Sequence, residues 1–251
     1  MNITAIDKPV EDQLVDFIVF PYFEKTKQLT GSAKNIDDLL NQSISKLITD
    51  GEISGKVSET TTLYTYGTIK PKKILIIGLG TLENCDMEIT RTIFGKLSSN
   101  LKVKEKSSAL ICLDTETISK SPKTFTKNQF VQAAVEGLIL GNYQFTKHKS
   151  DAKENETDIL LHFEKDELTE VNRAISVGNI VSNAVNLCRD LANEPSNILT
   201  PSKLADTAKQ LSVNSNLEYK SLDRDEMESL RMGALLGVAK GSKENTKLIV
   251  L

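Results

Sequence analysis

The 251-residue sequence contains no tryptophan, only two histidines and only three cysteines. Cys85, Cys112 and Cys188 are odd in number, lie far apart and form no Cys-x-x-Cys pair. This pattern does not indicate a disulfide framework. We therefore expect reduced thiols, as in a cytoplasmic protein.

Long apolar runs are also missing. No run approaches the roughly 18 apolar residues that a transmembrane helix needs, although hydrophobic residues make up 39% of the chain and suffice for an ordinary core. Residues 1–12 carry acids where a secretion signal has basic and then apolar residues. We expect no membrane partner, no export signal and a cytoplasmic location.

The chain has no strong excess of one charge. Its formal net charge is -3, which gives no general reason to expect nucleic acid as a partner. The length suits one large domain or two modest ones.

Motifs of several enzyme classes are absent or incomplete. There is no Gly-x-Ser-x-Gly nucleophile elbow. Gly78-Leu79-Gly80 follows an apolar run, but Glu83 occupies the place of the third glycine in a phosphate-binding Gly-x-Gly-x-x-Gly loop. An acid there would repel phosphate, so a tight turn is the preferred interpretation. His148 and His162 have no Cys or His partner at a metal-ligand spacing, and we interpret them as surface or satisfied residues.

Other polar clusters have structural explanations. Residues 223–228 contain four acids, of which Asp223 and Glu226 fit a helix capping box and the others a solvated face. At the end of a predicted long helix, Arg189 suits the helix dipole, and Asp190 could pair with another subunit or with the missing domain. Asn193 and Asn197 are expected to satisfy backbone groups of the following loop. We therefore assign no catalytic, cofactor-binding or metal-binding residue.

What the sequence does contain is an alternation of strands and helices. Strands are predicted at 16–21, 59–67, 73–77, 108–113 and 158–163, and helices at 37–49, 87–101 and 126–140. The run at 73–77 is apolar on both faces and is predicted to be central, whereas 59–67 alternates with period two, as a half-exposed edge strand does. This order predicts an α/β fold with a mixed sheet and helices on both faces. Residues 147–158 are predicted to form a charged surface loop.

A long helix follows. Small or apolar residues recur at spacings of three and four from Leu168 to Leu191, which is one stripe of a helix over 166–193. It should end near Asn193, because Pro195 disfavours helical geometry in the residue before it. Thr200-Pro201 then begins another helix as N-cap and first-turn proline.

The last segment predicts an incomplete unit. A helix at 201–211, a strand at 217–222 and an apolar strand at 247–251 give a small core. A buried parallel strand at 247–251 would need a crossover and neighbouring strands that the sequence does not supply. We therefore expect that the chain stops inside its second domain.

Three blocks of sequence together resemble the leucyl aminopeptidase (cytosol aminopeptidase) family. The first block runs over 186–201 and includes Arg189-Asp190-Leu191, Asn193 and Thr200-Pro201. The second contains Met232-Gly233, Gly237-Val238 and Gly241-Ser242 before a Leu-Ile-Val strand. The third, upstream, contains Glu136-Gly137, Tyr143, Phe145 and Lys149. The blocks occur in the family's order over nearly the whole chain.

This resemblance implies a three-layer macro-like N-terminal α/β domain with a mixed sheet at 1–164. It further implies a linker helix at 165–194 and the truncated beginning of a metallopeptidase domain at 195–251. In the family, two divalent metals, zinc or manganese, activate the water that releases N-terminal amino acids from peptides, and members assemble as homo-hexamers. The metal ligands lie on Phe-Asp-(Ser/Thr)-Gly-Gly and Asn-Thr-Asp-Ala-Glu-Gly-Arg motifs, and neither occurs here. The implied chain is inactive alone and holds no cofactor itself.

A second hypothesis belongs to a different class. The chain could act as a self-standing binding or assembly module, in which the macro-like domain recognises a nucleotide, a regulator or another subunit. The Gly78-Leu79-Gly80 turn is the feature that favours it.

Overall fold

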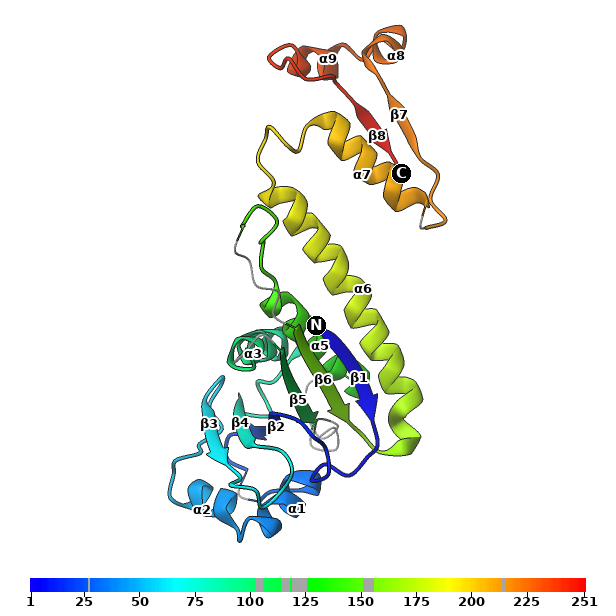
Figure 1. Cartoon of the computed structure of the whole chain (residues 1–251). Helices are drawn as coiled ribbons and strands as arrows, with labels where there is room; N and C mark the ends of the chain where they lie inside the picture. The colour runs from blue at the N-terminus through cyan, green and yellow to red at the C-terminus, as the bar shows by residue number, and fades with distance from the viewer. Residues whose placement is uncertain (27, 103–105, 114–117, 119–125, 151–155, 214) are drawn as a thin grey trace. The chain divides into compact units, whose positions relative to one another are not determined.

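The computed structural model describes residues 1–26, 28–102, 106–113, 118, 126–150, 156–213 and 215–251. It divides into two compact units, Met1–Asn186 and Leu187–Leu251. Each unit is described by itself below, with the element labels of Figure 1.

In the described residues of the first unit, six strands form one mixed sheet in the order β1-β6-β5-β2-β4-β3. The strands are β1 (Asn2–Ile6), β2 (Phe17–Phe23), β3 (Thr60–Tyr64), β4 (Lys73–Gly80), β5 (Lys106–Cys112) and β6 (Glu156–His162). All neighbours pair in parallel except β3, which runs antiparallel to β4. The predicted threonine-rich edge strand is therefore confirmed, although it is shorter than expected, and β4 is an interior strand one place from that edge.

Helices cover both faces of this sheet, which gives the predicted three layers. On one face, α1 (Gly31–Leu39) and α2 (Ser43–Thr49) bury Ile36 and Ile44 against the sheet. On the other face lie α3 (Met87–Asn100), α5 (Lys127–Asn142) and the first turns of α6 (Leu168–Asn193). Strand β4 is buried on both faces, as predicted, since all of its residues after Lys73 are buried.

The single helix predicted at 37–49 is wrong. The chain breaks after α1, because Asn41 and Gln42 both adopt positive φ angles, of 53° and 59°. Asp37 is buried, and its carboxylate accepts hydrogen bonds from the backbone N–H of Ile44, at 2.7 Å, and of Ser45, at 3.2 Å. A side chain expected on the helix surface thus caps the start of a second helix. Leu39, which the apolar spacing of a single helix at 37–49 would place inside, is 48% exposed.

The edge strand β1 is not among the predicted strands. It pairs in parallel with β6, so that Asn2 lies opposite Asp158 and Ile6 opposite His162. Five residues with one buried isoleucine carry little local signal, and the strand depends on a partner far along the chain. Of the predicted charged loop at 147–158, residues 151–155 lie outside the described part of the chain.

Where helices α3 and α5 cross, glycines of α5 allow the two backbones to come into close contact. A Cβ atom built on Gly137 would stand 2.5 Å from the carbonyl oxygen of Arg91. One built on Gly141 would stand 2.3 Å from the carbonyl oxygen of Gly95. Beside this contact, Arg91 Nε donates to the buried carboxylate of Glu136 at 2.5 Å. The crossing therefore combines close backbone contact with an ion pair at its rim.

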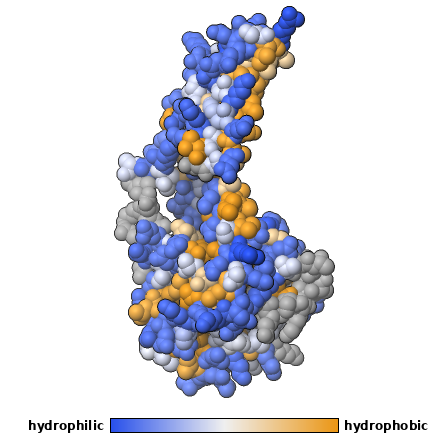
Figure 2. All heavy atoms as spheres, turned by 90° about the vertical axis from the view of Figure 1, so that its right-hand side faces the viewer, coloured by the Kyte–Doolittle hydropathy of each residue, from blue (hydrophilic) through white to orange (hydrophobic). Residues whose placement is uncertain are grey.

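The long helix α6 ends at Asn193, as predicted from Pro195. In the first unit its buried residues are Val171, Ala174, Ile175, Gly178 and Ser182. The helix also carries exposed apolar residues, namely Val177, Ile180, Val181 and Val185. Figure 2, which views the α6 side of Figure 1, shows orange apolar side chains among the blue polar ones.

The second unit contains α7 (Pro201–Val213), β7 (Lys220–Leu222), α8 (Arg224–Ser229), α9 (Gly233–Ala239) and β8 (Leu248–Val250). Strand β8 pairs antiparallel with β7 and is partly exposed. The expected buried parallel strand is therefore wrong, because β7 lies close enough to pair with the returning chain directly. The predicted capping box is confirmed, with Asp223 N–H donating to Glu226 Oε2 at 2.9 Å.

None of the helices in the described ranges combines the length and the apolar character that crossing a bilayer would require.

Candidate functional site

The Gly78-Leu79-Gly80 segment belongs to strand β4 and is closed by backbone contacts. Gly78 N–H donates to the carbonyl oxygen of Glu59 at 2.8 Å, and Gly80 N–H donates to that of Gly55 at 2.8 Å. A Cβ atom on Gly78 would stand 1.9 Å from the carbonyl oxygen of Lys56. Glycine is therefore needed here because the loop with Gly55 and Lys56 passes close to the strand. The N–H groups of Gly78 and Gly80 are occupied and cannot bind a phosphate. The interpretation as a phosphate loop is not supported.

Glu59 holds that crossing loop in place. Its carboxylate accepts hydrogen bonds from the backbone N–H of Ser54, at 2.9 Å, and of Gly55, at 2.8 Å. Burial on its own would raise the pKa of Glu59, but these hydrogen bonds outweigh it, and the pKa lies below its ordinary value. The Glu59 carboxylate therefore stabilises this loop.

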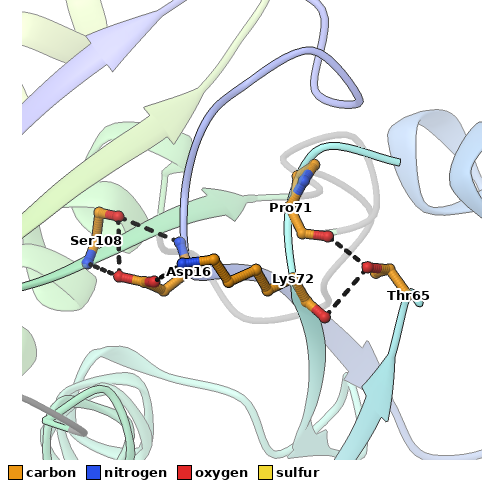
Figure 3. A network of polar contacts seen from close by, with 5 residues as sticks. All are labelled: Asp16, Thr65, Pro71, Lys72 and Ser108. Carbon is orange, nitrogen blue, oxygen red and sulfur yellow. Dashed lines mark hydrogen bonds and ion pairs between the residues drawn. The ribbon is translucent and has the colours of Figure 1, made fainter. Parts of the chain in front are cut away.

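A polar network joins the amino ends of the strands, as Figure 3 shows. Asp16 accepts hydrogen bonds from the backbone N–H and the hydroxyl of Ser108, at 3.2 and 3.3 Å, and pairs with Lys72 at 3.0 Å. Nearby, the Thr65 hydroxyl donates to the carbonyl oxygen of Pro71 at 2.6 Å. These contacts tie β2, β5 and β4 together, which is a role in the fold.

A cavity of about 250 Å³ lies at the opposite, carboxyl ends of the parallel strands. Its walls come from the last residues of β2, β5 and β6 and from the segment that enters α1. The described residues that line it are Phe20 to Phe23, Thr26, Gln28 to Ala33, Cys112, Leu113, His162 to Glu164 and Glu167. We take this cavity as the candidate functional site.

The topology explains why a cavity forms at this place. From β2 the chain continues to α1 and α2 on one face, and from β5 it continues to α5 on the other. Loops that leave adjacent parallel strands toward opposite faces open a crevice at their carboxyl ends, where α/β proteins commonly bind ligands. The cavity therefore lies at the place where this type of fold commonly binds ligands.

Two potential ligating groups stand side by side at the floor of this cavity. Cys112 and His162 are register partners in the parallel pair β5 and β6, so their side chains point to the same face. Burial raises the pKa of the Cys112 thiol, which keeps it protonated. Burial also lowers the pKa of His162, an effect that carboxylates led by Glu164 partly offset. A protonated thiol and a neutral imidazole do not form an activated nucleophile pair.

Acidic groups gather on the β6 side of the cavity. Glu167 Oε2 accepts a hydrogen bond from the backbone N–H of Glu164 at 3.0 Å, and its other oxygen pairs with Lys127. Asp7 and Glu11, which follow β1, also act on His162 electrostatically. The two oxygens of Glu167 are therefore both engaged, one by Lys127 and the other by the backbone N–H of Glu164.

The other residues singled out from the sequence do not meet at a common site. Asp223 pairs with Lys247, and Glu228 lies 3.8 Å from Arg224, so the acids of 223–228 bind cations or cap α8. The His148 and Phe145 rings contact edge to face at 5.7 Å. Cys85 is buried and Cys188 exposed.

The two divalent metals implied by the family resemblance have no matching donor set in the described residues. No group of three or more His, Cys, Asp or Glu side chains in those ranges is arranged to hold a metal ion. The described residues therefore do not form a metal site of the kind that the resemblance implies.

The sequence did not point to the Thr26–Ala33 segment of the cavity. The described residues of this segment, Thr26 and 28–33, match no motif, and only the sheet order brings them beside Cys112 and His162. No local sequence signal marks it, because the segment falls between the strand predicted at 16–21 and the helix predicted at 37–49.

Comparison with solved structures defines the class of fold. The chain superposes on a tomato leucine aminopeptidase mutant, K354E, with a TM-score of 0.81 over 99% of this chain and 50% of that one, at 22% identity. It also resembles the bottromycin maturation enzyme BotP in complex with Mn, with a TM-score of 0.71 over 94% of this chain and 44% of that one, at 16% identity. The fold is therefore shared with about half of a leucine aminopeptidase chain.

Sequence comparison then gives the family. The family model for the N-terminal domain of the cytosol aminopeptidase family matches residues 18–152, and the model for its catalytic domain matches residues 186–251. The chain belongs to the cytosol aminopeptidase family.

Individual relatives align with the whole chain. It is 33% identical over 251 residues to a probable cytosol aminopeptidase of Solibacter usitatus, covering 100% of this chain and 48% of that protein. A probable cytosol aminopeptidase of Alkaliphilus metalliredigens is 32% identical over 260 residues, covering 100% and 50%. The chain spans about half the length of these relatives.

Proposed function

We propose that the chain supplies three segments of a leucyl aminopeptidase-like metallo-exopeptidase: the N-terminal α/β domain at 1–164, the linker helix at 165–194 and the first part of the catalytic domain at 195–251. One observation carries the proposal. The two family models match in order along one chain, with α6 spanning the boundary between the matched regions.

The complete enzyme would release N-terminal amino acids from peptides with a free N-terminus. Two divalent cations, zinc or manganese, would activate the attacking water, and a solved neighbour is described as a complex with Mn. We further propose a cytoplasmic homo-hexamer. The present residues would contribute the scaffold and none of the catalytic groups, so the chain alone is expected to be inactive.

The direct test is an assay of the purified chain with leucine p-nitroanilide and Mn²⁺ or Zn²⁺. We expect no turnover above the metal-only blank. Turnover at the rate of the full-length Solibacter usitatus relative, measured in parallel, would refute the proposed inactivity.

A chimera tests the role of the chain as the first half of the enzyme. The chain is fused to the part of the Solibacter usitatus relative that follows its matched region. We expect hydrolysis that EDTA abolishes and added metal restores. A chimera with native circular dichroism and cooperative unfolding but no hydrolysis would contradict the proposal.

The alternative, a binding module, is not supported by Gly78-Leu79-Gly80, because this segment is part of β4 and the N–H groups of both glycines are occupied. The cavity at the carboxyl ends of β2, β5 and β6 is the observation that favours a binding role. A binding role of this cavity is compatible with the proposal that the chain is part of an enzyme.

A further inference from the structure

Strand β3 lies at the end of the sheet of the first unit, beside β4, as Figure 1 shows. Two hydrogen bonds reveal which of its residues bind β4. The Glu59 carbonyl oxygen accepts from the Gly78 N–H at 2.8 Å, and the Thr65 N–H donates to the Lys72 carbonyl oxygen at 3.2 Å. Because bonding residues alternate along an antiparallel pair, the odd-numbered residues of β3 direct their N–H and C=O groups toward β4. The even-numbered residues direct theirs away from the sheet.

The outward groups belong to Thr60, Thr62 and Tyr64. Among the described residues, none donates to or accepts from the backbone of these three, and all three residues are exposed. A row of N–H and C=O groups without partners is a template for another strand. The outer side of β3 is therefore a surface on which a further strand can pair.

This edge lacks the features that usually protect a sheet edge from pairing. Such features are charged side chains, proline and bulges. Residues 60–68 contain neither a charged residue nor a proline, and the register between β3 and β4 runs without a shift. Threonine and tyrosine also favour extended strands. The segment is therefore better suited to pairing with a strand than to remaining an open edge.

The segment is complementary to itself. When two copies of β3 run antiparallel about Thr62, this residue lies opposite Thr62 of the second copy, and Thr60 lies opposite Tyr64. All of these residues have outward groups, so each pair can exchange both of its hydrogen bonds. Threonine with threonine, and an aromatic with a β-branched residue, are favourable cross-strand pairs. A second copy therefore fits this edge in both its hydrogen bonds and its side chains.

The nearby lysine does not oppose this arrangement. The Lys73 ammonium group lies over the Tyr64 ring, 5.0 Å from its centroid. Since Tyr64 is at one end of β3, a two-fold axis through the centre of the strand puts the Lys73 residues of the two copies at opposite ends of the contact. The Tyr64 side chain, which belongs to a residue that is 57% exposed, would be partly covered by Thr60 of the second copy.

We propose that β3 pairs antiparallel with β3 of a second copy of this chain, about a two-fold axis between the two Thr62 residues. The pairing continues the sheet of one copy into that of the other and uses the same edge of both, so it closes as a dimer. Ser58 and Tyr66 have positive φ angles of 61° and 49°, which bend the chain at either end of the paired segment. The contact is therefore short, and we expect a dissociation constant on the order of 10–100 μM.

Pairing through β3 goes beyond the proposed homo-hexamer, for which no surface is assigned, and it does not depend on hydrolase activity. Association is measured on the whole chain without metal or peptide substrate, whereas the proposed function is tested by hydrolysis in the chimera. A monomeric chain with an active chimera and a dimeric chain with an inactive chimera are therefore distinguishable results.

Sedimentation equilibrium of the whole chain over a range of concentrations is the first measurement. The mass should rise from 27.7 kDa toward twice that value as the concentration passes through the micromolar range. Amide hydrogen exchange of the ¹⁵N-labelled chain, followed by NMR, then locates the contact. The amides of Thr60, Thr62 and Tyr64 should be protected only at high concentration. Those of Thr61 and Leu63, which face β4, should be protected at every concentration.

A charge pair across the two-fold axis tests the register. Thr62→Lys and Thr62→Glu each place two like charges opposite one another, and each should weaken self-association about fivefold. When the two variants are mixed in equal amounts, a lysine lies opposite a glutamate, and the mixture should associate about as tightly as the parent. Because Thr62 is exposed, both variants should unfold at the urea midpoint of the parent.

Thr4→Lys is the matched control. Thr4 is an exposed threonine at the middle of β1, the strand at the opposite edge of the same sheet. This variant should associate like the parent. If Thr4→Lys and Thr62→Lys both weakened association, β1 of one copy would pair with β3 of another, which contradicts the symmetric pairing.

Three further results would overturn the proposal. They are a chain that stays monomeric at millimolar concentration, self-association that Thr62→Lys and Thr62→Glu leave unchanged, and amide protection that does not alternate along residues 60–64. A mixture of the two Thr62 variants that associates no more tightly than either variant alone would contradict the register.

Discussion

Gly141 of α5 faces Gly95 of α3 so closely that a Cβ atom on Gly141 would stand 2.3 Å from the Gly95 carbonyl oxygen. The same Cβ would lie 2.6 Å from the Gly95 Cα atom. No side chain can be accommodated at that distance unless the helices separate, so the layer beside the sheet depends on this glycine.

Replacing Gly141 with alanine should therefore destabilise the first unit. We expect a loss of about 1–3 kcal/mol, the usual effect of overpacking, despite the better helix propensity of alanine. The measurement is the urea midpoint and slope of the chain.

Gly95→Ala is the matched control, because its Cβ would meet its nearest neighbour at 3.5 Å, an ordinary contact. That variant should be neutral or slightly stabilised. Equal losses in the two variants would show that the close approach is not the cause.

The Arg91–Glu136 pair should show strong coupling. The Glu136 side chain is only 3% exposed, and its second oxygen accepts from Gln132 Nε2 at 2.7 Å. Arg91→Met leaves this buried carboxylate without its cation, and we expect a loss of about 3 kcal/mol. Adding Glu136→Gln should recover part of it, because an unpaired charge is then no longer buried. A double-mutant cycle on unfolding free energies measures this, and strict additivity would contradict it.

Asp37 should be essential for the α1–α2 turn. Its carboxylate receives two backbone N–H groups and the Ser45 hydroxyl, so Asp37→Ala should cost about 2 kcal/mol as a lost cap with buried donors. Asp38→Ala, at the exposed neighbouring position, is the control and should change stability little. Thermal unfolding of both variants checks the difference.

Glu59 predicts a pH effect with a defined sign. Its pKa in the folded chain lies below the ordinary value of 4.5, so it adds stability that is complete above that value. This contribution disappears as the pH falls through the lower folded-state pKa. The stability difference between the parent and Glu59→Gln should therefore shrink in acid. A difference that stays constant from neutral pH to below the folded-state pKa would contradict the assignment.

Local sequence signals predicted the elements whose cause is local. The α5 capping box is present, with Gln129 N–H donating to the Thr126 hydroxyl at 3.2 Å. The end of α6 at Asn193 follows from Pro195 in the same way. The layered fold was predictable because the alternation of strands and helices is itself a local pattern.

Features that depend on distant partners were not predictable from the sequence. The break between α1 and α2 depends on a buried aspartate that serves the next helix, and helical periodicity cannot reveal this. The cavity depends on the neighbours β2, β5 and β6, which come from three separate parts of the chain. Periodicity describes the faces of elements, whereas a site of this kind arises from strand order.

Strand β1 has a consequence for synthesis on the ribosome. Asn2 to Ile6 leave the exit tunnel long before their only described partner strand, β6, which ends at His162. Pairing between segments so far apart in sequence is slow to form. The β1 segment therefore stays without its partner strand while the intervening strands and helices are synthesised. The β1 edge of this sheet can therefore form only after β6 has been synthesised.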